Sequence, residues 1–146
     1  MNKINLQEKT KAEKGTAEMF WFENEFVNLE KTLFHRIIVP LKAFDSGLKY
    51  ETQLTETEIY IDWLELNLKN PNDLDGLNIT SETHKKIETS VYVGGAHNWC
   101  DVTKLSINKI NNNTYSIDCH LFIDFKNEGV AENENFIFKT TIEFIS

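Results

Sequence analysis

The chain has 146 residues, of which 40% are hydrophobic and 26% charged, with a formal net charge of −8 and an isoelectric point near 5.0. This composition is typical of one globular domain and excludes a disordered chain, and the length allows an ordinary core without disulfide or metal staples. The negative charge disfavours nucleic acid and anionic membranes as partners, because proteins bind both through clustered Lys and Arg.

Charge is distributed unevenly along the chain. Residues 1–16 contain four Lys and two Glu and show no hydrophobic periodicity, which predicts a polar N-terminal arm that is either frayed or a short helix. Residues 17–146 carry a net charge of −10 and are expected to form a single β-rich domain. Because the N-terminus lacks the apolar stretch of a secretory signal, we expect a cytoplasmic protein.

Two templates compete between residues 17 and 33. A helical stripe with spacings of three and four residues is formed by Met19, Phe22, Phe26, Leu29 and Leu33. Against it, the aromatic run Phe20-Trp21-Phe22 and the nearby Val27 favour a strand. We favour the strand and keep the helix as the alternative. Pro40 then marks an edge or the end of the next apolar segment, because proline cannot donate to a strand ladder.

The middle of the chain predicts a strand with a β-bulge. Apolar residues alternate from Ile59 through Ile61 to Trp63 and then change phase by one residue at Leu64. A turn is expected at residues 70–73 (NPND). A short strand follows at residues 87–93 and ends at the Gly94-Gly95 pair.

Residues 101–146 predict a three-stranded antiparallel meander. Alternation assigns one set of apolar positions to the core: Tyr115, Ile117, Cys119, Leu121, Ile123 and Phe125. Phe122, Ile137 and Ile145 interrupt the opposite, polar face, so another layer of this domain or a partner is expected there. With about seven strands, we predict a mainly β fold, an antiparallel β-sandwich or a strongly curved sheet. The alternative is an α+β fold with an N-terminal helix on the sheet.

Acidic residues are densest between residues 51 and 75, where Lys69 is the only base. This segment is either a solvated strand edge with its loop or a surface that attracts a basic partner. Trp99 lies among glycine and polar residues, as interface anchors often do. The predicted partner-binding residues are Glu56, Glu58, Asp62, Glu65, Asp73, Asp75, His97 and Trp99.

Reactive side chains gather only in residues 94–101 (GGAHNWCD) and at Cys119-His120. His97, Cys100, Cys119 and His120 have zinc-type ligand chemistry, but neighbouring residues on a strand point to opposite faces. Buried thiols are therefore favoured, with a Cys100–Cys119 disulfide or zinc as alternatives.

The sequence gives little support for a catalytic function. A nucleophilic Cys100 activated by His97 lacks visible cationic surroundings. Asp118 and Asp124 are separated by about 20 Å along a strand, too far for one glycosidic bond. We expect no catalytic residue, metal or cofactor.

Four short segments carry a family resemblance: residues 90–98 (SVYVGGAHN), 101–105 (DVTKL), 39–41 (VPL) and 62–64 (DWL). In these the chain resembles small uncharacterised bacterial β-rich proteins, and small acidic proteins of this kind resemble the immunity proteins of bacterial toxin systems. The resemblance implies a non-enzymatic domain that binds and blocks a basic toxin, and it transfers no functional residue.

Two other functions stay open. One is a small-ligand-binding or hydrolytic domain with a pocket in a curved sheet, lined by Phe and Trp. The other is a subunit that assembles through its sheet edges. The oligomeric state is open in all of these readings.

Overall fold

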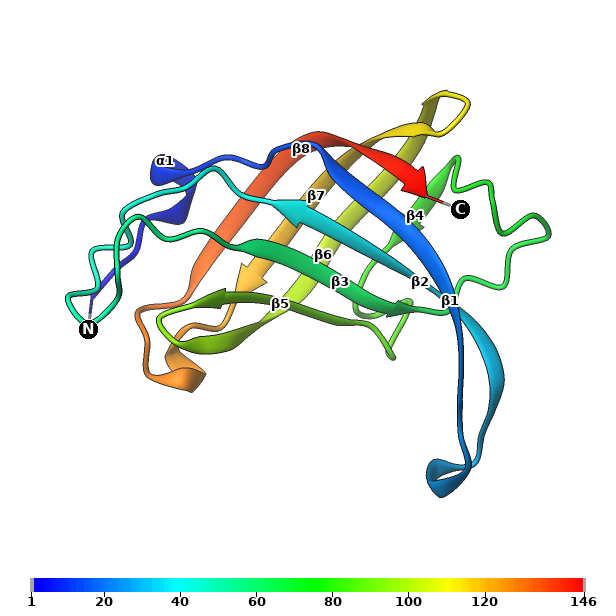
Figure 1. Cartoon of the computed structure of the whole chain (residues 1–146), viewed down its shortest axis with the longest axis horizontal. Helices are drawn as coiled ribbons and strands as arrows, with labels where there is room; N and C mark the ends of the chain where they lie inside the picture. Colours follow the sequence, from blue (N-terminus) through cyan, green and yellow to red (C-terminus); the bar gives the residue numbers. More distant parts are fainter. Residues whose placement is uncertain (1, 146) are drawn as a thin grey trace.

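The computed structural model describes residues 2–145 and has a mainly β architecture (Figure 1), as predicted. Its elements are α1 (Leu6–Lys9), β1 (Gly15–Asn24), η1 (Glu25–Val27), β2 (Leu29–Pro40), β3 (Glu58–Leu64), β4 (Leu77–Ile79), β5 (Glu88–Val93), β6 (Ala96–Asn111), β7 (Thr114–Ile123), η2 (Lys126–Glu128) and β8 (Glu134–Ile145). Within this range no helix has the length and apolar character needed to cross a membrane.

The eight strands form one continuous sheet in the order β4-β6-β5-β3-β2-β1-β8-β7, and β6 pairs with β7 as well. The sheet therefore closes on itself through seven strands. The short β4 lies beside residues 105–107 of β6, beyond the part of β6 that pairs with β5. Neighbouring strands are antiparallel except for β1 and β8, which run parallel over four residue pairs.

The predicted meander is confirmed as β6, β7 and β8. The six alternating positions from Tyr115 to Phe125 are all buried, since they point into the space that the sheet encloses. The interior is filled by large side chains such as Tyr115, Phe125 and Phe136. Residues 2–145 form eight strands, whereas the sequence predicts about seven.

Residues 17–33 adopt the strand conformation, in β1 and β2, with the single 3-10 turn η1 between them. The helical stripe fails as a predictor because apolar residues occupy both faces of this hairpin. Phe20 and Phe22 contact Trp63 on one side, while Trp21 alternates to the other side and is 61% exposed. The alternative of an N-terminal helix over these residues is wrong.

The bulge predicted in β3 is present. His35 of β2 is opposite Leu64, whereas Ile37 is opposite Ile61, so β3 contains one extra residue over this interval. Trp63 has φ of 58°, the left-handed conformation that absorbs the insertion. Its indole consequently packs against Phe34 and other rings of the β1–β2 hairpin.

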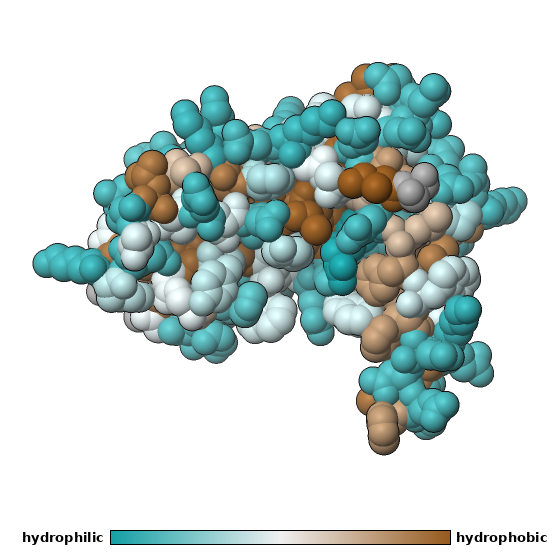
Figure 2. All heavy atoms as spheres, viewed as in Figure 1, coloured by the Kyte–Doolittle hydropathy of each residue, from teal (hydrophilic) through white to brown (hydrophobic). Residues whose placement is uncertain are grey.

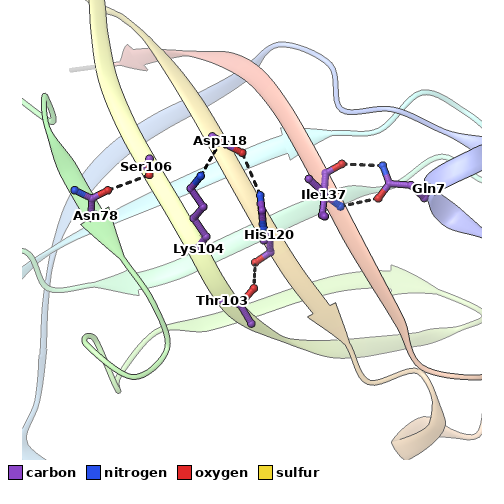
Figure 3. Close-up of polar contacts among 8 residues, drawn as sticks. All are labelled: Gln7, Asn78, Thr103, Lys104, Ser106, Asp118, His120 and Ile137. Atoms are coloured by element: carbon purple, nitrogen blue, oxygen red, sulfur yellow. Dashed lines mark hydrogen bonds and ion pairs between the residues drawn. The ribbon is translucent and has the colours of Figure 1, made fainter.

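The segment before β1 packs along β8. Ile4 and Leu6 are fully buried, and the Glu134 carboxylate accepts hydrogen bonds from three successive backbone N–H groups, those of residues 4–6, at 2.8–3.0 Å. Gln7 exchanges two hydrogen bonds with the backbone of Ile137 (Figure 3). These contacts cover a stretch of β8 that β1 does not reach, because β1 pairs only with residues 142–145.

Of the two coverings expected over the meander, a second layer of this domain is absent from the described chain, and a partner stays a prediction. Ile137 and Ile145 are about half exposed, at 48% and 51%. The closed sheet buries its apolar residues inside, so its outer face needs no covering sheet.

Candidate functional site

Exposed aromatic side chains gather on the outer face of β3, β5 and β6. Tyr60 is opposite Ser90, which in turn is opposite Trp99, so the three lie in one row across the sheet. In the next row Tyr92 is opposite His97, and their rings meet edge to face with centroids 4.8 Å apart. Tyr92 and Trp99 are each 48% exposed, and exposed apolar side chains that gather in one patch often mark an interaction site.

Carboxylates surround these aromatic rings. Glu58 and Asp62 flank Tyr60 on β3, since residues two apart share a face, and Asp62 is opposite Glu88 of β5. We call this surface the acidic aromatic face, defined by Glu56, Glu58, Tyr60, Asp62, Glu88, Tyr92, His97, Trp99 and Asp101. The intervening positions, such as Ile61, are buried in the interior.

Part of this charge is compensated within the molecule. Arg36 of β2 binds Asp62 (Nε to Oδ2, 3.0 Å) and Glu18 (3.3 Å). The Tyr60 hydroxyl donates to Glu58 at 3.0 Å, and this bond to a carboxylate is the main cause that raises the pKa of Tyr60. Glu56, Glu88 and Asp101 have no ion-pair partner among residues 2–145 and keep the face negative.

An open groove of about 610 Å³ runs along one margin of the face. Tyr60, Tyr92 and His97 contribute rings to its wall, and Glu56 and Glu58 contribute carboxylates. Apolar walls with anionic rims suit the side chain of a Lys or Arg, whose stem is apolar and whose head is cationic.

The structure brings together five of the eight predicted partner-binding residues: Glu56, Glu58, Asp62, His97 and Trp99. The remaining three have local structural contacts elsewhere. Glu65 binds Lys86 at 2.8 Å, Asp73 accepts from the backbone N–H of Asp75, and Asp75 accepts from that of Lys109.

Four members of the face are not among the residues predicted from the sequence: Tyr60, Glu88, Tyr92 and Asp101. Their signal is strand alternation, because each occupies the outward phase beside buried neighbours such as Val91. That signal becomes specific only when the strand neighbours are known.

Both cysteines are buried and free. Cys119 points into the core while His120 lies on the outer face, so the second pair of the zinc alternative is divided between opposite faces of β7. Burial raises the pKa of Cys100 to about 12 and also raises that of Cys119, so neither thiol has the properties of a nucleophile. Within residues 2–145, no three His, Cys, Asp or Glu side chains are arranged to hold a metal ion.

Farther along β6, where Lys104 lies beside Asp118 of β7, the outer face carries a paired carboxylate instead (Figure 3). Asp118 lies between Lys104 (3.0 Å) and His120 (3.5 Å), and the hydrogen bond from Lys104 is the main cause that lowers the Asp118 pKa. Asp118 is thus committed to its ion pair with Lys104 rather than to a carboxylate dyad. Glu56, Glu88 and Asp101, which have no ion-pair partner in the described part of the chain, distinguish the acidic aromatic face from this neighbouring surface.

No protein-family model, curated protein or solved structure matches the chain. The resemblance to immunity proteins therefore stays an expectation, and the case for function depends on the geometry of the face.

Proposed function

We propose that this protein is a non-enzymatic binding domain that recognises a basic protein through the acidic aromatic face. The observation that carries the proposal is the set of exposed rings, Tyr60, Tyr92 and Trp99, on a face where three carboxylates have no ion-pair partner within residues 2–145. Tyr and Trp are the side chains that most often dominate binding energy at protein interfaces. Clustered carboxylates accelerate association with a basic partner by long-range attraction.

An immunity-type inhibitor of a bacterial toxin fits this description, since such a protein must capture its toxin quickly. Cys100 and Cys119 are both free thiols, and thiols stay reduced in the cytoplasm, so a cytoplasmic location would agree with the structure. We also infer a strongly curved, closed sheet rather than a two-sheet sandwich, because strand pairing continues around all seven strands of the ring. Such a closed sheet holds the face rigid.

The test is binding to the purified product of the neighbouring gene, the expected toxin. Surface plasmon resonance at about 50 mM and about 300 mM salt should show an association rate that falls as salt rises. The variant E56Q/E88Q/D101N removes three carboxylates that have no ion-pair partner in the described chain. It should slow association by about tenfold at low salt, with little change in dissociation.

The matched control is E8Q/E82Q/E128Q, which removes the same charge from exposed positions that are not members of the face. The control should associate nearly as fast as the parent protein at each salt concentration. Absence of binding at low salt would contradict the proposal. Equal slowing by the two triple variants would show that net charge, not this face, steers the encounter.

The groove gives a specific reason to keep a small-ligand function as the second candidate. His97, Glu56 and Glu58 meet at its wall and could bind a cationic or hydroxyl-rich molecule. Cys100 is buried outside it and does not contribute. A screen of amines and sugars by ligand-detected NMR, repeated with Tyr92→Ala, separates this candidate from protein binding.

A further inference from the structure

The β1–β2 hairpin extends beyond the closed sheet as a free arm (Figure 1). β1 pairs with β8 only over residues 15–18, and β2 pairs with β3 only over residues 35–40. Residues 20–24 and 29–34 therefore lie beyond the pairing with β8 and β3, and the pairs they make are with each other. In Figure 1 this arm leaves the body and ends in η1, which is the point farthest from the sheet on that side.

A two-stranded hairpin is marginally stable by itself, so this arm requires bracing. Trp63 supplies it: its ring contacts Phe20, Phe22 and Phe34, with centroids 5.6, 4.9 and 5.1 Å away. The bulge in β3 makes these contacts possible, because it turns Trp63 towards the hairpin. Arg36 adds a cation–π contact, 4.6 Å above the Phe20 ring.

The tip of the arm is ordered and presents apolar side chains. The Asn24 side chain accepts a hydrogen bond from the Phe26 backbone N–H at 3.0 Å, and Asn28 closes the turn with φ of 54° and a bond to the Glu25 carbonyl. Phe26 is 100% exposed and Val27 is 69% exposed. A hydrogen-bonded turn that displays a wholly exposed Phe resembles a preformed binding element, because its backbone has less entropy to lose on docking than an open loop has.

The charge of the arm identifies the kind of surface that it fits. Glu23, Glu25 and Glu30 lie next to the tip. Two bases are near: Lys31, 5.5 Å from the Trp21 ring centroid, and Lys86, which lines a groove with Val27 but is paired with Glu65. An anionic membrane would repel these carboxylates. A protein pocket that is apolar at its base and rimmed by Lys or Arg would complement them.

The arm also shares a boundary with the acidic aromatic face. A groove of about 440 Å³ between arm and body is lined by residues that include Val27, Leu29, Trp63 and Glu88. Glu88 belongs to both the groove and the face. In Figure 2, apolar side chains continue along the arm, and the arm and the body enclose a notch.

We propose that the arm inserts Phe26 into an apolar, Lys- and Arg-rimmed pocket of the same basic protein that the acidic aromatic face binds. This inference rests on the proposed function and adds to it the element that enters the partner. A toxin active site that binds an anionic substrate has this chemistry, so the arm would act as a plug while the face provides steering and area.

The test uses a photo-reactive phenylalanine analogue, p-benzoylphenylalanine, at position 26, 99 or 110 of the full-length protein in the cells that encode it. Position 99 reports on the face, and position 110 is an exposed residue near the far end of β6. We expect positions 26 and 99 to cross-link to one and the same basic protein, and position 110 to give no adduct with it. Peptide mapping should place the adduct of position 26 next to Lys or Arg.

The possible outcomes separate the two proposals. Cross-linking from position 99 alone would overturn the arm inference and leave the proposed function standing. No common basic partner from either position would overturn both. An adduct of position 26 with lipid or with a second copy of this chain would also overturn the arm inference.

The purified partner then allows a quantitative test. Phe26→Ser should weaken its affinity at least about tenfold, as truncation of an interface anchor does. Ile110→Ser, the matched control, also removes an exposed apolar side chain and should change affinity less than about twofold. Both variants should keep the parental melting temperature, because neither residue is buried. An unchanged affinity in Phe26→Ser would refute the inference.

Discussion

Replacing Trp63 by Ala should destabilise the protein and loosen the arm. The substitution removes three aromatic contacts, those with Phe20, Phe22 and Phe34. A fully buried Trp→Ala change costs about 3–5 kcal/mol, and aromatic pairs contribute about 0.5–1.5 kcal/mol each beyond burial. Because Trp63 is only half buried, we expect a loss of about 2–3 kcal/mol in the free energy of unfolding.

Trp63→Gly is the matched variant that tests the bulge geometry. In an ordinary strand Gly is less stable than Ala by about 0.5–1 kcal/mol. Trp63 has φ of 58°, where an L-residue costs about 1–2 kcal/mol that Gly avoids. Trp63→Gly should therefore be at least as stable as Trp63→Ala.

Urea denaturation followed by circular dichroism gives both free energies, and hydrogen exchange shows where structure is lost. Peptides covering residues 19–34 should exchange faster in both variants, while peptides from the meander of β6–β8 keep their protection. A loss below about 0.5 kcal/mol in Trp63→Ala, or uniform exchange across the chain, would refute the bracing role. A clearly lower stability of the Gly variant would refute the bulge.

Three further outcomes are expected. Glu134→Ala should lose about 2–3 kcal/mol in urea denaturation, because three backbone N–H groups, two of them partly buried, lose a charged acceptor, whereas Glu128→Ala should be neutral. Burial lowers the pKa of His35 in the folded protein, so the free energy of unfolding should be full above pH 6.5 and should fall as the pH drops towards that lowered pKa. Urea denaturation at several pH values should show a weaker pH dependence for His35→Gln. Cys100 and Cys119 should react with Ellman's reagent at pH 8 only after unfolding; rapid labelling of the native protein would contradict their raised pKa values.

Local patterns in the sequence determine most of the strand assignments. Alternation from Tyr115 to Phe125 identifies the buried face of β7, and the phase change at Leu64 identifies the bulge in β3. Both signals are local, because side-chain direction in a strand depends only on the residue's own position in the pleat. The same signal is ambiguous in β1, where Phe20, Trp21 and Phe22 are apolar on both faces.

The candidate site is predictable only in part, because strand neighbours as well as local patterns decide which residues belong to it. The acidic segment and Trp99 are visible as composition, so five of eight predicted residues lie on the face. Tyr60, Tyr92 and Asp101 join them because β3, β5 and β6 are neighbours, and that neighbourhood is long-range information. Asp73 and Asp75 were predicted on charge alone, but their carboxylates cap turns and backbone groups.

By itself, then, the sequence determined an acidic, mainly β domain with an outward and an inward set of side chains on each regular strand. Only the tertiary structure decided which outward sets lie side by side, how the sheet closes through β6 and β7, and that the β1–β2 hairpin leaves the sheet as an arm. Strand pairing decides these features, and pairing partners are selected by the packing of the whole core rather than by any local stretch of residues. Phe26 illustrates the difference, since in the sequence it completes a helical stripe and in the structure it is a fully exposed tip.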